Sequence, residues 1–324
     1  MTDTIDTYKH RFDKVFNSEN DRVKAHQMCK NILEDLSQDT ALLKIVLMNG
    51  LSNKDFLCQT HYPVVRFPMF DYVDKYLLVA HVWQPLPSNS TDYTSKAIHT
   101  HGPLMLSTVT SFGPGYYHYL FNKPDRISPD TEQFDLKLQA EGHHPLSDVL
   151  FCDQYLAHVP MFPEKLSITY ALWSNSKPTR FLSRIKKIPA IHRRANSLRT
   201  ILKAVGMGRT LDLKFEDYLD FYPSPNGFMG VKKRVEVEYK RGPIGDRVQS
   251  IIHLLQETGN EDLIDLCQDD LESNKSMEPN EKLECLKLIS AARKGEEIAP
   301  KLTEKLHFGF EKMNFTHEQI KASL

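Results

Sequence analysis

Two histidines separated by one residue give the strongest chemical signal in this sequence. His99 and His101 flank Thr100, and a third histidine, His158, opens another apolar run further along the chain. Alternate side chains of a β-strand point to the same face, so His99 and His101 would converge while Thr100 points away. Three neutral imidazoles on one ion leave coordination positions open for substrate or oxygen. The spacing therefore predicts a catalytic metal centre, although a chain with 14 histidines also contains such pairs by chance.

Short apolar segments at close spacing must position these histidines. The segment Phe112-Gly113-Pro114-Gly115 predicts a hairpin turn, because glycine adopts the positive φ that a chain reversal needs. Runs of short strands at hairpin spacing are typical of a small antiparallel barrel or jelly roll. We therefore expect a central antiparallel β-barrel over residues 61–176, in which the last two predicted strands pair. The predicted strands are Lys75–Trp83, Leu104–Ser111, Tyr116–Phe121, Cys152–Val159 and Leu166–Trp173.

The order of these features over about residues 62–174 is informative. A strand ending near Trp83, a loop, the histidine pair, the Gly-Pro-Gly turn and His158 follow one another. This order resembles the cupin superfamily, and within it the thiol dioxygenases of the cysteine dioxygenase type. The resemblance implies that His99, His101 and His158 hold Fe(II), or another divalent metal. It also implies that Arg66, upstream of Trp83, pairs with a substrate carboxylate.

The sequence departs from this family in its last strand. Where the thiol dioxygenases carry a Ser-x-His-x-Tyr pattern, this chain has Thr169-Tyr170-Ala171-Leu172-Trp173. The resemblance thus implies a non-haem iron oxygenase or dioxygenase acting on a small thiol- or carboxylate-bearing substrate, and it leaves the substrate open. The alternative is a non-catalytic cupin module that binds a ligand or a protein partner. Bound metal would distinguish the two.

Several imidazole and aromatic side chains are candidates for the surroundings of the metal. His81 and Trp83 are two residues apart on one predicted strand, and so are Tyr116 and His118 on another. Each pair therefore shares a face of its strand, which could be the interior one. Such side chains can hold metal ligands in place, although packing in the core is the simpler role. The candidates for the pocket or for contacts around the ligands are His81, Trp83, His118, Tyr170 and Trp173.

The segments on either side of the predicted barrel indicate an α+β protein with helical ends. Residues 1–60 show helical periodicity at Val23–Leu36 and Asp39–Asn49, and these helices should pack against the barrel. Residues 177–241 form a basic connecting segment with a possible edge strand at Val231–Tyr239. Residues 242–324 are mostly helical, and these helices could support a homo-oligomer. Their predicted helices are Asp246–Glu257, Asn260–Glu272, Glu278–Lys294 and Thr303–Asn314.

Charge and composition exclude some classes of partner. The formal net charge is -1, no run of about 18 apolar residues occurs, and the N-terminus is polar, so neither a membrane span nor a signal peptide is predicted. Five scattered cysteines fit reduced thiols, and we expect a cytoplasmic protein with a small-molecule substrate. Residues 177–209 contain Lys and Arg but no Asp or Glu. Few aromatic residues lie between these basic residues, so ion pairing with the acidic residues 261–272 is favoured over the binding of nucleic acid.

Overall fold

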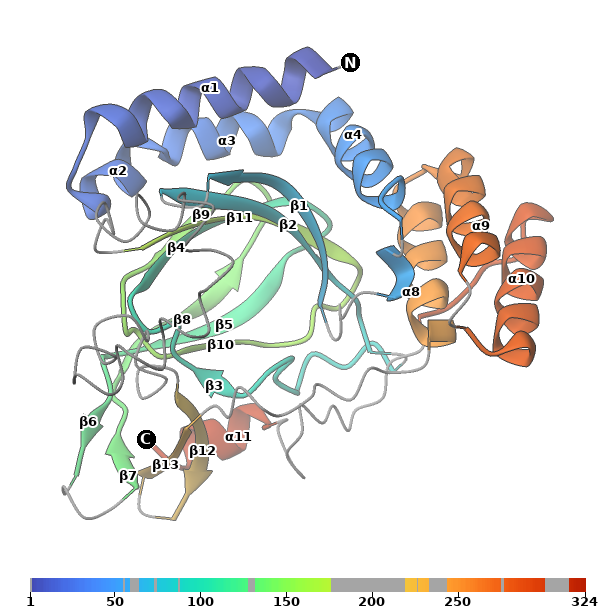
Figure 1. The fold of residues 1–324 in the computed structure, drawn as a ribbon. Coiled ribbons are helices and arrows are strands. Elements are labelled where there is room, and N and C mark those ends of the chain that lie inside the picture. The colour runs from blue at the N-terminus through green and yellow to red at the C-terminus, as the bar shows by residue number, and fades with distance from the viewer. Residues whose placement is uncertain are drawn as a thin grey trace, which may run out of the picture.

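Helices from both ends of the chain pack beside two curled antiparallel sheets (Figure 1). This computed structural model describes residues 2–54, 56–58, 64–72, 75–86, 88–127, 132–175, 219–225, 227–232, 244–274, 277–300 and 315–324. The basic residues 177–209 and the predicted helix Thr303–Asn314 lie outside the described residues. The expected mixture of helices and antiparallel sheets is confirmed, and the two sheets face each other as halves of a sandwich.

The first sheet lies beneath the N-terminal helices. Its central strands are buried almost along their whole length, because helices cover one face and the second sheet lies against the other. Its strand order is β1 (Val64–Tyr72), β2 (Tyr76–Trp83), β11 (Ser167–Asn175), β4 (Leu104–Phe112) and β9 (Val149–Cys152). Neighbouring strands in it are antiparallel, and Thr169 of β11 lies opposite His81 of β2.

The second sheet carries the histidine-bearing strands near its middle. Two of its strands come from the predicted connecting segment, far along the chain from their neighbours. Its strand order is β6 (Asp125–Arg126), β7 (Gln133–Asp135), β13 (Gly227–Lys232), β12 (Leu219–Ser224), β3 (Ile98–His99), β10 (His158–Pro160), β5 (Tyr116–Phe121) and β8 (Leu138–His144).

The Gly-Pro-Gly turn connects the two sheets, so the hairpin predicted there is wrong. β4 belongs to the five-stranded sheet and β5 to the eight-stranded sheet, and they do not pair. Gly113 and Gly115 do adopt positive φ, at 76° and 84°. A Cβ on Gly113 would lie 2.0 Å from the carbonyl oxygen of Leu166, and one on Gly115 1.9 Å from that of His144. Both glycines are needed because the crossing brings backbones into contact.

Two other strand predictions also need correction. The segment Cys152–Val159 is not one strand, because a turn in which Tyr155 has φ 60° separates β9 from β10. β11 pairs with β2 and β4, so it does not pair with β10 as expected. The edge strand expected at Val231–Tyr239 is in part β13, which lies between β7 and β12 and is therefore internal; residues 233–240 lie outside the described residues. Sequence spacing could not show which strands become neighbours.

Four N-terminal helices cover the outer face of the five-stranded sheet (Figure 1). The helix predicted at Val23–Leu36 is divided at Cys29 into two helices, whereas the next prediction is close to the observed helix. The side chain of Asp21 accepts hydrogen bonds from the first turn of the second helix, and that of Asp39 does so for the fourth. The helices are α1 (Thr2–Ser18), α2 (Arg22–Met28), α3 (Lys30–Gln38) and α4 (Thr40–Leu51).

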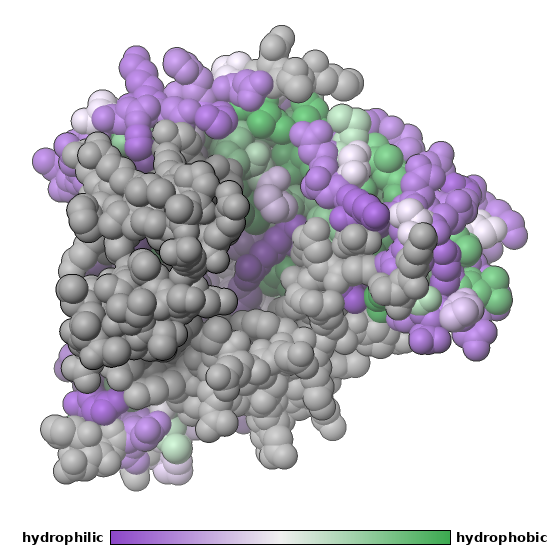
Figure 2. Space-filling model, viewed as in Figure 1, coloured by the Kyte–Doolittle hydropathy of each residue, from purple (hydrophilic) through white to green (hydrophobic). Residues whose placement is uncertain are grey.

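The C-terminal helices extend the same core beside α4 (Figure 1). α8 (Ile244–Glu257), α9 (Ile264–Ser273) and α10 (Pro279–Arg293) agree with three of the predicted helices. A short helix that was not predicted, α11 (His317–Lys321), packs near β5, where the Tyr119 hydroxyl and His317 Nδ1 are 2.5 Å apart. The outer surfaces of α1 and of the C-terminal helices are mainly hydrophilic in Figure 2. None of the helices in the described residues is long and apolar enough to cross a membrane.

Candidate metal centre

Three imidazole rings meet at the centre of the eight-stranded sheet. His158 of β10 lies directly opposite His99 of β3 in the antiparallel register, and His101 follows two residues after His99. The ring centroids of His99, His101 and His158 lie 4.7, 4.5 and 4.4 Å apart in the three pairs. One ligand nitrogen from each ring falls within 4.8 Å of the others. The convergence predicted from alternation and from the later apolar run is confirmed.

Backbone carbonyls hold two of these rings in one tautomer. His99 Nδ1 lies 2.8 Å from the carbonyl oxygen of Ala97, and His158 Nδ1 lies 3.2 Å from that of Leu156. A carbonyl can only accept, so each Nδ1 carries the proton, and the lone pair of the neutral ring is on Nε2. Metal-binding histidines commonly donate their second N–H in this way. The backbone therefore presents Nε2 as the ligand atom.

The distances between the nitrogens fit a single ion. His99 Nε2 and His101 Nε2 are 3.0 Å apart, which is the spacing of adjacent ligands at roughly 2.1 Å from a metal at about a right angle. His99 and His158 are buried and His101 is half-buried. Burial lowers the pKa of His158 to about 4, with the charge of Lys96 acting in the same direction. His158 is therefore neutral at physiological pH, as a ligand must be.

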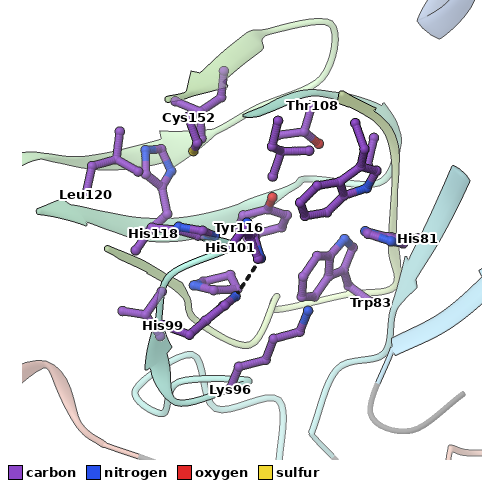
Figure 3. Close-up of a pocket in the computed structure, with 17 residues that line it drawn as sticks. His81, Trp83, Lys96, His99, His101, Thr108, Tyr116, His118, Leu120 and Cys152 are labelled. Atoms are coloured by element: carbon purple, nitrogen blue, oxygen red, sulfur yellow. Dashed lines mark hydrogen bonds between the residues drawn. The ribbon is translucent and has the colours of Figure 1, made fainter. Parts of the chain in front are cut away.

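The three histidines open into a pocket between the two sheets (Figure 3). Of the residues predicted from sequence to surround the ligands, His81, Trp83, His118 and Trp173 line this pocket. Asp and Glu are absent from its lining within the described residues. The lining comprises His81, Trp83, Lys96, His99, His101, Leu106, Thr108, Tyr116, His118, Leu120, Leu150, Cys152, His158, Val159, Pro160, Ala171 and Trp173.

Two tryptophans form the pocket wall opposite the eight-stranded sheet. The Trp173 ring packs edge-on against His101 at 4.4 Å between centroids, which restricts the orientation of that ligand. Trp83 is held by a hydrogen bond from its Nε1 to Thr169 Oγ1 at 2.9 Å. Beside it, burial holds the pKa of His81 well below its ordinary value, with Arg66 and Lys96 acting in the same direction. His81 is therefore neutral and available only as a hydrogen-bonding group.

His118 also faces the pocket, from β5. Burial lowers its pKa to about 4, and the neighbouring His144 acts in the same direction. Its Nδ1 is buried without a hydrogen-bond partner among the described residues. His118 is too far along the sheet to be grouped with the three ligand nitrogens, so it is a neutral polar group beside the metal centre.

Tyr116, which alternation along β5 predicts on the same face as His118, lines the pocket with it. Sequence reasoning missed other residues of the pocket, among them Cys152 and Lys96. Cys152 is a free, buried thiol whose pKa burial raises to about 12, so it remains protonated. Lys96 lies in the segment before β3, where no periodic pattern indicates the direction of a side chain.

Two predicted site residues lie elsewhere. Tyr170 is buried on the helix-covered face of β11, within the core formed with the N-terminal helices, because its neighbours Ala171 and Thr169 take the opposite face. Arg66 is exposed on the edge strand β1 and does not line the pocket, although its Cα partner His81 does. Arg66 was expected beside the metal centre, and the structure places it elsewhere.

No protein-family model and no curated protein matches this sequence. Among solved structures, the chain is similar to the Cnp3 cupin domain of Schizosaccharomyces pombe, at 5% identity over 39% of this chain and 74% of that chain, with a TM-score of 0.26. It is also similar to the DMSP lyase DddQ of Ruegeria pomeroyi, at 10% identity over 35% of this chain and 47% of that chain, with a TM-score of 0.24. A third similar structure is a Klebsiella pneumoniae protein with a double-stranded beta-helix domain. The identity is 10% over 37% of this chain and 84% of that chain, and the TM-score is 0.24. The case for a metal centre therefore depends on the histidines of this chain.

Proposed function

We propose that this chain is a cupin-type enzyme in which His99, His101 and His158 hold Fe(II), and that it oxidises a small thiol- or carboxylate-bearing substrate as a non-haem iron oxygenase. The observation that carries the proposal is the convergence of three buried or half-buried imidazoles on one point, within 4.8 Å of one another. Three neutral nitrogens on one side of an ion suit metals that also bind substrate. Structural sites, by contrast, usually fill all positions with protein ligands.

The protein residues would each have a defined part in this chemistry. Bound Fe(II) would supply the redox chemistry, and the protein would supply binding and orientation. The carbonyls of Ala97 and Leu156 hold the protons on Nδ1 of two ligands, which keeps both Nε2 atoms ready to bind. Trp173 restricts the third ligand and, with Trp83, excludes water from that side of the pocket. The neutral imidazoles of His81 and His118 offer hydrogen bonds to a bound molecule.

Metal analysis tests the first half of the proposal. Protein purified without oxygen and loaded with Fe(II) should retain about one ion per chain after desalting, and His99→Ala and His158→Ala should each lose it. His143→Ala provides the matched control, since His143 is exposed on β8 and should have no effect on metal content. A wild-type protein that binds no divalent metal with all its histidines present would contradict the proposal and favour a metal-free binding module.

Oxygen consumption tests the second half. The iron-loaded protein should consume oxygen when 3-mercaptopropionate or L-cysteine is added, and His101→Ala should abolish the consumption while the fold is retained. Mass spectrometry of the thiol should then show added oxygen atoms. A protein that holds iron but consumes no oxygen with any small thiol or carboxylate would retain the metal centre and exclude the oxygenase.

A further inference from the structure

Residues 315–324, here called the 315–324 segment, pack against the sheet that carries the proposed metal ligands. Phe315 and Ile320 are the buried side chains of this segment. Both belong to the apolar core that contains Ile98, the residue before His99. In Figure 1 the helix of this segment, α11, lies beside β12 and β3. The segment therefore shares its core with the strand of a proposed ligand.

The 315–324 segment also forms backbone hydrogen bonds with the loop that leads into β3. The N–H of Thr94 donates to the carbonyl oxygen of Phe315, and the N–H of Phe315 donates to Thr94 Oγ1, both at 2.9 Å. Next to this pair, Tyr93 and Thr316 are antiparallel partners. The segment thus binds one edge of the loop in the way that a neighbouring strand would.

The other edge of this loop is bonded to the strand that contains His158. The backbone N–H of Ser95 donates to the carbonyl oxygen of Pro160 at 2.9 Å, and the Ser95 hydroxyl donates to the same oxygen at 3.1 Å. Pro160 lies in β10, two residues after His158. The loop is therefore held between the 315–324 segment and β10.

The end of the loop orients a proposed metal ligand. The carbonyl oxygen of Ala97 lies 2.8 Å from His99 Nδ1 and accepts its proton, so that Nε2 is presented to the metal. Ala97 lies two residues after Ser95, and a displacement of the loop would therefore move this carbonyl. Release of the 315–324 segment would remove a backbone partner of Thr94, which is buried, and would leave the loop held from the side of β10.

We propose that the 315–324 segment is a positioning element of the metal centre. Docked against the loop, it keeps the Ala97 carbonyl where that group orients His99, and its release weakens the binding of the metal. This inference rests on the proposed function through the metal site alone. A segment with two buried side chains can open locally while the sheets stay folded. Coupling between two sites is reciprocal, so a bound metal also holds the segment more firmly in place.

Hydrogen exchange of the wild type tests this coupling without any substitution. The backbone amides of residues 315–324 are followed by mass spectrometry in protein kept with a chelator and in protein loaded with Co(II). Loading should slow their exchange by about fivefold or more, as expected for two coupled sites. Exchange in α10, which lies in the other core, should change by less than about twofold, and this comparison separates local coupling from general stabilisation.

Substitution of Ile320 tests the coupling from the other direction. Ile320→Ala should lower the affinity for Co(II) by about tenfold, the lower end of the range for groups that orient metal ligands, and Ile320→Val should retain most of the affinity. Competition with a chelating dye measures these values. Ile289→Ala is the matched control, because Ile289 is an equally buried isoleucine in α10. It should cost similar stability and leave the affinity within about twofold.

The possible outcomes separate this inference from the proposed function. Unchanged exchange of the 315–324 segment on loading would overturn the inference, and this result decides it even where Ile320→Ala does not fold. An equal loss of affinity in Ile289→Ala and Ile320→Ala would also overturn it, since affinity would then follow overall stability. A wild type that binds no Co(II) would overturn the proposed function, and this inference with it. Slowed exchange on metal loading would support the inference even in a protein that consumes no oxygen.

Discussion

Two sets of buried histidines, which lie on opposite sides of the five-stranded sheet, have different hydrogen-bond partners. On the helix-covered face, His26 of α2 lies between two hydroxyls, with Nδ1 2.7 Å from Ser107 Oγ and Nε2 2.8 Å from Ser174 Oγ. On the other face, across the pocket, His99 and His158 each use one ring nitrogen on a backbone carbonyl and turn the other toward the ligand cluster. Both kinds of histidine are buried, so burial alone does not identify a ligand.

The difference shows how to distinguish a structural histidine from a metal ligand. His26 connects α2 to β4 and β11, and both of its nitrogens are occupied by protein groups. The cluster histidines instead bring nitrogens together at distances that only a shared proton or a shared ion makes favourable. The same two strands serve both sites, since Ser107 and Ser174 face the helices while their neighbours Thr108 and Trp173 face the pocket.

The largest expected effect is on metal affinity. Replacing His99, His101 or His158 by Ala should each lower the affinity for Co(II) by about 100-fold or more, because each removes one of three ligands. His26→Gln should leave the affinity within about twofold, since His26 lies on the other face of the sheet. Competition titration with a chelating dye measures both. A similar loss in His26→Gln would remove the distinction between the two kinds of histidine.

The second effect is on stability. His26→Ala should lower the free energy of unfolding by about 3 kcal/mol, because it leaves a cavity and removes the hydrogen-bond partner of two buried serines. His10→Ala, at an exposed position of α1, should change it by less than about 0.5 kcal/mol. Urea denaturation measures both values. Equal stability of His26→Ala and wild type would show that these hydrogen bonds do not hold the helices to the sheet.

The third effect concerns pH. Burial, and then the charge of Arg22, lower the pKa of His26 from 6.5 to about 3 in the folded protein. Below pH 6.5 the unfolded chain therefore binds a proton that the folded His26 does not bind, so stability is complete above that pH and is lost as the pH falls toward 3. Between pH 7 and pH 5 this group should account for a loss of about 2 kcal/mol. The loss in His26→Gln, followed by urea denaturation, should be smaller by about that amount.

The smallest expected effect is at Arg66. Because its side chain is exposed and lies outside the pocket lining, Arg66→Ala should change the affinity of the cobalt protein for 3-mercaptopropionate by less than about twofold. A large effect of Arg66→Ala, in a titration followed by the cobalt–thiolate absorbance, would return the carboxylate-binding role to Arg66.

Local rules were sufficient for much of the site. Alternation placed His99 and His101 together, and it put His81 and Trp83 on one face, because the period of two is a property of any strand. The same rule applied to β11 would have separated Tyr170 from Trp173, which lie three residues apart and therefore on opposite faces. The error at Tyr170 was thus one that the sequence could have corrected.

The sequence by itself determined the ligand types, the helical ends, most strand positions and the glycines of the turn at Gly113 and Gly115. These depend on periodicity and on local backbone conformation, which neighbouring residues fix. Only the tertiary structure decided that β10 lies between β3 and β5, that β12 and β13 join this sheet, and that Lys96 rather than Arg66 reaches the pocket. Pairing between strands distant in sequence depends on how whole sheets bury their faces, and no local pattern carries that information.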